Sequence, residues 1–331
     1  MGFDVGVSGA GPGPLFLLLI ALVIDAAIGD RLARLLPDPA GLAARLCAVL
    51  DRRLNRPQRG AAVRLVRGAL VVGVLMLAAV LAGLAVGWVG TAAPGGWLVE
   101  LVALLAVLRG GAARARVQAV RRALEGPGLE AARGALTGLT RRPLHGLDGH
   151  AVARAAMEHL AKAFDRKVVA PAFWYALLGV PGLLAWAVVD GADQALGRPG
   201  VRLERFGLTA ARMDDALNAL PARLTGLLLA LAAPFAATAS PRGALRALTR
   251  DTRKHASFNM GWPIAAMAGA LGISLVGPYR DGGVTVNEPW LGGGRARALP
   301  ADVGRALTLT GVAGLLLALL VGLLMAGVAA L

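Results

Sequence analysis

The chain has 331 residues, of which 56% are hydrophobic and only 5% are aromatic. Soluble domains are about 45–50% apolar, so the composition, with a mean hydropathy of +0.63, excludes an ordinary soluble domain. The formal net charge is +15, from 35 Lys and Arg against 20 Asp and Glu. No basic patch interleaved with aromatic residues accompanies this charge, so we expect no nucleic-acid partner. The lone Cys47 excludes an internal disulfide and a cysteine-based zinc cluster.

Uninterrupted apolar runs predict an all-α fold, a polytopic helical membrane protein with a cytoplasmic helical portion. No Lys or Arg precedes the first run, so we expect an uncleaved first span with the N-terminus outside. Tryptophans at run ends, Trp88, Trp97 and Trp186, are expected as anchors at the membrane interface. The four runs that we expect to span are 14–29, 68–90, 97–108 and 308–331.

Three further runs could either span the membrane or re-enter it. Residues 168–189 have spanning length but carry the sequence GVPG at their centre. Residues 220–239 are interrupted by Pro234, and residues 260–276 form the third run. Broken segments of this kind are tolerated where they are buried in protein or line a cavity.

Arginine-rich polar sections separate the runs, and the positive-inside rule places them in the cytoplasm. The first covers 31–67 and contains the turn-forming sequence PDP at 37–39. The second covers 109–167, where we expect helices over 112–124 and 149–164. We therefore expect one integral-membrane domain over 1–331, with 109–167 as a cytoplasmic helical section within it.

One polar island lies in the segment 208–224, which predicts a helix that ends near Pro221. Asp214 and Asn218 are four residues apart, and Asp215 is three residues before Asn218, so the three side chains can share a helix face. Two carboxylates and an amide beside an apolar run predict a site for a cation or a phosphate-bearing ligand. The alternative is a solvated helix end whose acids pair with Arg212 and Arg223.

A second polar island is the sequence TRDTRKHASFNMGWP at 249–263. Asp251, His255 and Asn259 recur every four residues and would line one face if the helix persists. The cations Arg250, Arg253 and Lys254 could hold phosphate oxygens. The alternative is a basic juxtamembrane loop bound to lipid headgroups. Smaller islands are the pairs Asp25 with Asp30 and Asp190 with Asp193.

Motifs along nearly the whole chain resemble the adenosylcobinamide-phosphate synthase family. The most specific is ARMDD at 211–215, followed by Asn218 and PARL at 221–224. The other matching motifs, in chain order, are IDAAIGD (24–30), PDP (37–39), VVAP (168–171), RD (250–251), His255, Asn259, GW (261–262), AGALG (268–272) and EPWLG (288–292).

The resemblance implies a multi-pass protein of the cell inner membrane, with its active face in the cytoplasm. It implies an ATP- and Mg²⁺-dependent ligase of cobalamin biosynthesis. Such an enzyme joins the corrinoid adenosylcobyric acid to aminopropanol phosphate, or aminopropanol, through an amide bond. Membrane lipid and a homo-oligomer or other cobalamin-pathway membrane proteins are its expected partners.

On this model, residue chemistry leads us to hypothesise three sets of roles. Asp214 and Asp215 would bind Mg²⁺ with the support of Asn218. Asp251, His255 and Asn259 are the candidate catalytic residues, and Asp251 or His255 would orient the nucleophile or take its proton. The residues assigned to substrate and phosphate are Arg212, Arg250, Arg253 and Asp193.

Several polar positions depart from the family's pattern. Where members carry E-N-x-x-D-G, this chain has KAFDRK at 162–167, so that Lys162, Ala163, Arg166 and Lys167 replace acid, amide, acid and glycine. The segment 187–198 keeps Asp193 and Gly197 but loses the family's Lys, Asn and Tyr, and Ile264 stands where an acid is usual. Replacing acids by cations disfavours Mg²⁺ and favours an anionic substrate.

These departures leave a second hypothesis open, in which the chain is a catalytically degenerate homologue. Such a protein would act as a membrane scaffold or as a subunit that holds the corrinoid. A transporter is a third alternative, prompted by the GVPG break and by Asp25 inside an apolar run.

Overall fold

The structure is a computed structural model that describes residues 11–330 except 57, 198, 199 and 201. Helices account for most of the described residues, which confirms the all-α expectation. The chain divides into two compact units. Unit 1 comprises Met1–Arg109, Ala170–Asn218 and Val321–Leu331, and unit 2 comprises Gly110–Val169 and Ala219–Leu320.

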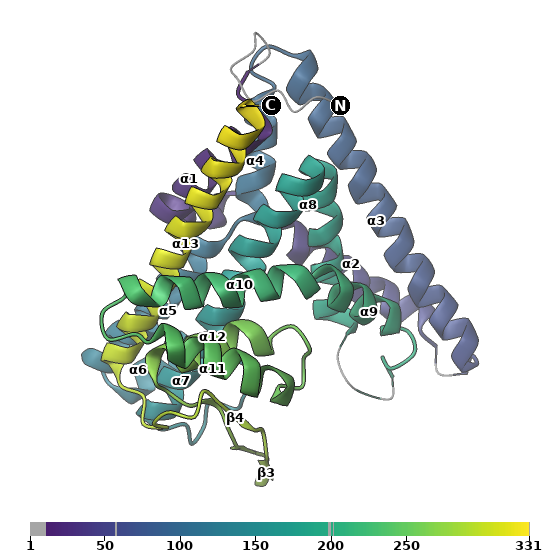
Figure 1. Cartoon of the computed structure of the whole chain (residues 1–331). Coiled ribbons are helices and arrows are strands. Elements are labelled where there is room, and N and C mark those ends of the chain that lie inside the picture. Colours follow the sequence, from purple (N-terminus) through teal and green to yellow (C-terminus); the bar gives the residue numbers. More distant parts are fainter. Residues whose placement is uncertain (1–10, 57, 198–199, 201, 331) are drawn as a thin grey trace. The chain divides into compact units, whose positions relative to one another are not determined.

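Unit 1 is built around the long helix α8, against which α2, α3, α4 and α9 pack (Figure 1). The prolines at 37 and 39 end one helix and begin the next, because proline is well suited to the first turn of a helix. The unit's helices are α1 (Pro14–Leu35), α2 (Pro39–Leu54), α3 (Ala61–Ala92), α4 (Trp97–Val107), α8 (Ala170–Leu196) and α9 (Leu208–Leu217).

Helix α8 is broken in its middle, where the sequence GVPG predicted an interruption. Gly179 has φ 65° and ψ −155°, a conformation that favours glycine, and Pro181 follows two residues later. The broken backbone packs directly on α3, because a Cβ added to Gly83 would lie 2.5 Å from Pro181 Cα. The irregular segment is therefore covered by protein, as non-helical backbone at membrane depth requires.

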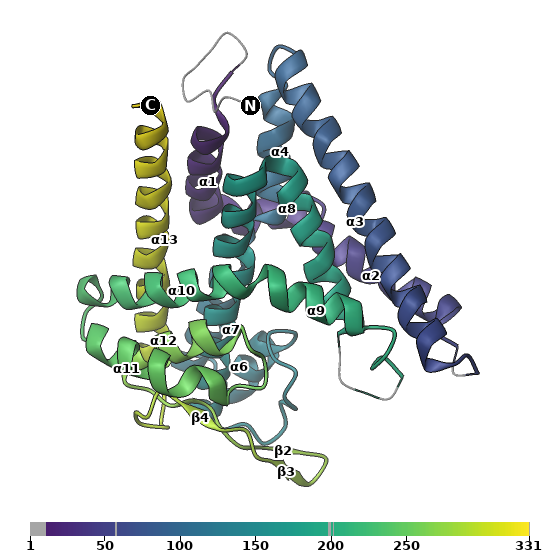
Figure 2. The ribbon, with the colours of Figure 1, turned by 45° about the vertical axis from the view of Figure 1, so that its right-hand side comes forward.

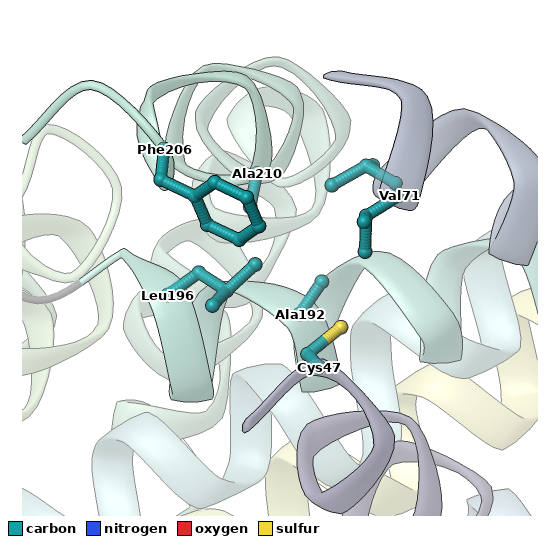
Figure 3. Close-up of a cluster of buried hydrophobic side chains, with 7 residues drawn as sticks. Cys47, Val71, Ala192, Leu196, Phe206 and Ala210 are labelled. Atoms are coloured by element: carbon teal, nitrogen blue, oxygen red, sulfur yellow. The ribbon is translucent and has the colours of Figure 1, made fainter. Parts of the chain in front are cut away.

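An apolar cluster fills the space between α2, α3, α8 and α9 (Figure 3). Cys47 lies in this cluster, and its burial raises the pKa of the thiol to about 11. The thiol is therefore protonated at neutral pH and acts as a small apolar side chain. The members of the cluster are Cys47, Val71, Val72, Ala192, Leu196, Phe206 and Ala210.

Unit 2 combines short helices and most of the long helix α13 (Pro300–Ala329) with two small antiparallel strand pairs. Strand β1 pairs with β4, and β2 pairs with β3 in a hairpin that Figure 2 shows beside the label of β4. Helices α11 and α12 approach closely, since a Cβ added to Gly243 would lie 2.4 Å from the carbonyl oxygen of Gly269. The elements are α5 (Gly110–Glu125), α6 (Leu129–Leu136), α7 (Gly149–Phe164), the π-helical turn η1 (Asp165–Val169), α10 (Ala219–Ala232), η2 (Ala233–Phe235), α11 (Pro241–Asp251), η3 (Thr252–Lys254), α12 (Gly261–Leu271), β1 (Leu275–Val276), β2 (Tyr279–Asp281), β3 (Val284–Val286) and β4 (Trp290–Leu291).

Among the described residues, three helical segments are long and apolar enough to cross a membrane. They are Ala61–Ala92, Gly149–Leu196 (which includes α7, η1 and α8) and Pro300–Ala329, the helix α13. The adjacent helices Leu208–Leu217 and Ala219–Phe235 would make a fourth if they count as one broken span. The chain is therefore a multi-pass membrane protein by the length and composition of its helices.

The structure differs from two of the expectations about spans. The predicted first span is a helix, α1, but its charged residues keep it outside the three segments above. Helix α4 has eleven residues, which rise about 16 Å and fall short of the roughly 30 Å of hydrocarbon. In the run 260–276, where spanning and re-entry were both open, helix α12 has eleven residues and is too short to span, and a turn and strand β1 follow it.

The structure also corrects two predicted helix boundaries. The helix expected to end near Pro221 ends at Leu217, and Pro221 lies in the first turn of α10, where a missing amide donor costs little. The helix expected to carry Asp251, His255 and Asn259 on one face does not persist. Helix α11 ends at Asp251, η3 follows, and the chain leaves helical geometry at His255.

Candidate functional site

In unit 1 the predicted pair of Asp214 and Asn218 is buried and hydrogen-bonded. Asp214 is 3% exposed, and Asn218 Nδ2 donates to its Oδ1 and to its backbone carbonyl, each at 2.9 Å. The indole Nε1 of Trp186 donates to Asn218 Oδ1 at 3.0 Å. Asn218 therefore fixes the Asp214 carboxylate, and helix α8 fixes Asn218 through Trp186.

This hydrogen bond corrects the expectation for Trp186. We expected Trp186 to be an interface anchor, but its side chain is buried and holds Asn218 in place through this hydrogen bond. Trp88 is exposed, as an anchor would be. Trp186 lies fifteen residues after the end of the VVAP motif, and nothing in that apolar-rich run distinguishes a buried indole from an interfacial one.

The other predicted residues of unit 1 lie on two helices, α8 and α9. Asp215 is half-buried and Arg212 is exposed, both on α9. Asp193 lies on α8, with its carboxylate over the turn that ends the helix, since a Cβ added to Gly197 would lie 1.8 Å from Asp193 Oδ1. Asp190, one turn earlier than Gln194, accepts a 2.8 Å hydrogen bond from its amide.

In unit 2 the predicted residue Asp251 is the centre of a polar cluster. Arg250 donates to both carboxylate oxygens through Nε and Nη2, at 2.9 and 2.7 Å. Lys254 Nζ donates to Oδ1 at 2.7 Å, and the backbone N–H of Gly292 donates to Oδ2 at 2.9 Å. The hydrogen bonds from Arg250, followed by those from Lys254 and Gly292, hold the pKa of Asp251 well below its usual range. A carboxylate so bonded orients its neighbours and does not take a proton near neutral pH.

His255 lies just beyond this cluster in a half-buried position. Its Nδ1 accepts the backbone N–H of Ser257 at 2.9 Å and lies 3.3 Å from the carbonyl oxygen of the same residue. Burial, and then the positive charge of Lys162, lower the pKa of His255 below its ordinary value. Both effects favour the neutral form of the ring.

The charged groups that act on His255 belong to a network that the sequence did not reveal. Arg142 Nη2 lies 2.7 Å from Glu288 and 3.1 Å from Glu158. Lys162 Nζ donates to Glu158 Oε1 at 2.6 Å on the next turn of α7. The four-residue spacing of Glu158 and Lys162 was readable, as was Glu288 inside the EPWLG motif. The arginine that joins them comes from a loop, and no pattern predicts that contact.

Two positions that depart from the family's pattern carry cations held by acids of unit 2. Lys162 pairs with Glu158, as described above. Arg166 Nε lies 3.9 Å from Asp165 Oδ2 in the π-helical turn η1. Asp165 is fully buried and accepts a 2.8 Å hydrogen bond from Thr225 Oγ1 of α10. Ile264, which stands where the family usually has an acid, is fully buried within α12.

The remaining predicted residues of unit 2, Arg253 and Asn259, lie between α11 and α12. Asn259 is fully buried, and its backbone carbonyl accepts the N–H of Trp262 at 3.1 Å. Arg253 is exposed. Arg223, considered as a partner for the acids of the first island, instead stacks over Phe258 and Trp262, with its guanidinium carbon 4.8 and 4.9 Å from the ring centroids.

The donor chemistry of each cluster tests whether it suits Mg²⁺. Among the described residues, no group of three or more His, Cys, Asp or Glu side chains is arranged to hold a metal ion. Mg²⁺ in ATP-dependent sites uses only one or two protein carboxylates, with water and substrate phosphates completing its shell. Asp214 and Asp215 would supply two such carboxylates, whereas Asp251 is already bonded to two cations.

Known proteins share this sequence over most of its length. The family model described as CobD/Cbib protein matches residues 18–310. A "Cobalamin biosynthesis protein CobD" from Sinorhizobium sp is 38% identical over 322 residues, covering 92% of this chain and 98% of the relative. The protein of that name from Rhodobacter capsulatus is 38% identical over 301 residues, covering 88% and 91%. No solved structure matches. The chain therefore belongs to the CobD/Cbib family, the adenosylcobinamide-phosphate synthase family of cobalamin biosynthesis.

Proposed function

We propose that this protein joins adenosylcobyric acid to aminopropanol phosphate, or to aminopropanol, through an ATP-dependent amide bond. The observation that carries the proposal is the match to the family model over residues 18–310, nearly the whole chain. Relatives that this chain covers almost from end to end are named for cobalamin biosynthesis. The corrinoid and the amine are the substrates that this family membership favours.

The chemistry explains why ATP is required. A carboxylate is a poor acyl donor, because its leaving group would be oxide. Attack of the substrate carboxylate on the γ-phosphorus of ATP releases ADP and gives an acyl phosphate. The amine then displaces inorganic phosphate, and the nitrogen loses one proton as the amide forms. The protein must hold phosphate oxygens, place the amine and exclude water from the acyl phosphate.

We assign the Mg²⁺-binding role to Asp214 and Asp215 on α9. The ion would neutralise phosphate charge and polarise the phosphorus that is attacked. Asn218 supports this role by holding the carboxylate of Asp214 at 2.9 Å. Because its own oxygen accepts the indole N–H of Trp186, the amide acts as a positioning group.

The roles in unit 2 follow from the hydrogen bonds there. Arg250 and the exposed Arg253 are the phosphate-binding cations, and Arg212 of unit 1 is assigned the same role independently. Asp251 is a positioning residue, because it orients Arg250 through two hydrogen bonds. His255 orients the nucleophile or takes its proton through a ring nitrogen, and Asn259 holds the loop that carries His255.

The basic sections favour the cell inner membrane with a cytoplasmic active face. In this arrangement 1–331 is one integral-membrane domain, and 109–167 is a cytoplasmic helical section within it. Association with a second copy, or with other membrane proteins of the pathway, completes the proposal.

One observation favours a second candidate, a degenerate homologue that holds the corrinoid without turnover. Lys162 and Arg166 stand where the family has acids, and both form ion pairs with acids of this chain. Cations fixed in this way repel a divalent metal while leaving an anionic ligand attracted.

Complementation separates the two candidates. A strain that lacks the synthase is given this gene and is fed either cobyric acid or cobinamide. The ligase predicts cobalamin-dependent growth on both, while the degenerate homologue predicts growth on cobinamide alone. Replacing Asp214 and Asp215 with Asn should abolish growth on cobyric acid, whereas Asp30→Asn, which alters a surface pair with Arg34, should not.

A further inference from the structure

The buried face of α2 in unit 1 changes from apolar to polar along its length. Ala43 and Cys47 pack in the core, and the next residues at the same four-residue spacing are Asp51 and Asn55, which are also buried. Helix α3 shows the same boundary, because Arg67 directly precedes the apolar stretch that begins at Gly68. The apolar core of the unit therefore ends at this end of α2 and α3.

A hydrogen-bond network organises two arginines at this boundary. Asn55 Nδ2 donates to Asp51 Oδ1 at 2.8 Å and to the carbonyl of Arg202 at 2.9 Å. Arg64 Nε donates to Asn55 Oδ1 at 2.7 Å, and its Nη2 donates to the carbonyl of Arg202. The Arg202 guanidinium in turn pairs with Asp51. The network thus fixes Arg64 and the chain around Arg202 against the end of α2.

The charge around this network is strongly positive. The acids of residues 45–67 and 202–205 are Glu204 and Asp51, and Asp51 is buried and bonded within the network. The arginines of these two segments are Arg45, Arg52, Arg53, Arg56, Arg59, Arg64, Arg67, Arg202 and Arg205. Most of these side chains are exposed, so the surplus is available to an anion outside the protein.

Exposed leucines accompany these arginines on the same part of unit 1. Leu35, Leu42 and Leu46 are 79%, 63% and 43% exposed. Leu42 and Leu46 lie on α2 beside the exposed Arg45, and the opposite face of the helix packs on α8. Exposed leucine next to arginine on one helix is the pattern of a helix that lies in the membrane interface. The exposed leucines therefore favour a lipid surface over a site for a soluble anion.

We propose that α2, the first turns of α3 and Arg202 form a binding surface for the phosphate of an anionic phospholipid headgroup. Leu42 and Leu46 contact the upper acyl chains, while the arginines contact the headgroup phosphates. The apolar part of α3 continues from this surface as a candidate span, which places the surface at membrane level. Arginine suits this ligand because its planar guanidinium binds phosphate through two parallel hydrogen bonds.

The test measures lipid binding to the full-length protein in uncharged detergent by native mass spectrometry. Phosphatidylglycerol should bind more tightly than phosphatidylcholine, and rising salt should reduce the difference. The variants Arg52→Gln with Arg53→Gln, and Arg202→Gln, should each weaken phosphatidylglycerol binding roughly fivefold per arginine removed. Arg202→Lys should retain part of the affinity, because lysine keeps the charge but loses the paired hydrogen bonds. Arg280→Gln, which removes an exposed arginine from the β2 strand, should leave the affinity unchanged.

Three results would overturn the proposal. The first is equal binding of the two lipids, and the second is an equal effect of Arg280→Gln and the α2 variants. The third is displacement of phosphatidylglycerol by inorganic phosphate, which would make the surface a site for a free anion. If Arg202→Gln fails to fold, the Arg52 and Arg53 variants still decide, because these side chains are exposed and lie outside the network.

Discussion

Asp251 accepts the backbone N–H of Gly292 at 2.9 Å, although 41 residues of chain separate them. The contact joins the end of α11 to the glycine-containing loop after β4, and Arg250 and Lys254 complete the carboxylate's hydrogen bonds. The residue predicted to be catalytic is therefore first a structural link within unit 2.

Asp251→Ala should lower the free energy of unfolding by about 1–3 kcal/mol, the cost of leaving the donors of Gly292 and Arg250 without an acceptor. Equilibrium unfolding in mixed micelles measures this change. Asp281→Ala, on an exposed strand of the hairpin, is the matched control and should stay within about 0.5 kcal/mol. Equal effects of the two substitutions would contradict the structural role.

His255 should make stability depend on pH. Its folded-state pKa is lowered by burial and by Lys162, against the opposing charges of Glu158 and Glu288. The unfolded state therefore binds more protons, so stability is fully present above roughly pH 6.5, the unfolded pKa, and falls as pH drops through the folded pKa.

Thermal unfolding as a function of pH measures this effect. His255→Gln should reduce the loss that begins below about pH 6.5, while the control His145→Gln, at an exposed position, should retain it in full. Asp251 also has a lowered pKa, but its contribution disappears only below about pH 4, its unfolded value. A pH profile that is unchanged in His255→Gln would refute the assignment.

Gly83→Ala should destabilise unit 1, because the added Cβ would lie 2.5 Å from Pro181 Cα and 2.6 Å from its N. The two helices would have to separate at the break in α8, which we expect to cost about 1–3 kcal/mol. Gly87→Ala on the same helix is the control, since its added Cβ meets nothing within 4 Å. This control should be neutral or stabilising by up to about 1 kcal/mol, because alanine favours a helix.

Asn218→Leu should lower stability by about 1–3 kcal/mol, because it leaves the buried Asp214 and the indole of Trp186 without their hydrogen-bond partner. Arg212→Gln, at an exposed position of α9, should leave unfolding unchanged. Equilibrium unfolding measures these changes, and an assay of amide formation shows whether Asn218 also positions Asp214. If Asn218→Gln is as stable as the wild type but inactive, the Asn218 amide sets the geometry of Asp214. If Asn218→Leu and Asn218→Gln both unfold like the wild type, these hydrogen bonds do not stabilise the fold.

The sequence predicted the helices that local patterns specify. The helix expected over 149–164 is found as α7 at Gly149–Phe164, because an acidic N-cap, Asp148, precedes an amphipathic stretch. The spacing of Asp214 and Asn218 predicted that the two side chains share one face, and they lie close enough to form a hydrogen bond. The break at Gly179 followed from the GVPG sequence.

What the sequence did not predict depends on contacts between distant segments. Asp251, the last residue of α11, accepts hydrogen bonds from Lys254 and from Gly292 of a distant loop. Trp186 is buried because Asn218 accepts its N–H. Arg142 joins Glu158 to Glu288 from a loop. Propensity and periodicity describe single segments of the chain. They therefore do not predict contacts between residues that are far apart in the sequence.

The most direct test of the proposed function is turnover by the purified protein with ¹⁸O-labelled adenosylcobyric acid, aminopropanol phosphate and Mg-ATP. The account predicts one amide product for each ADP released, with one labelled oxygen of the substrate carboxylate recovered in inorganic phosphate. A second CobD/Cbib protein serves as the positive control. Absence of the amide while that control turns over, or formation of the amide without label in phosphate, would contradict the account.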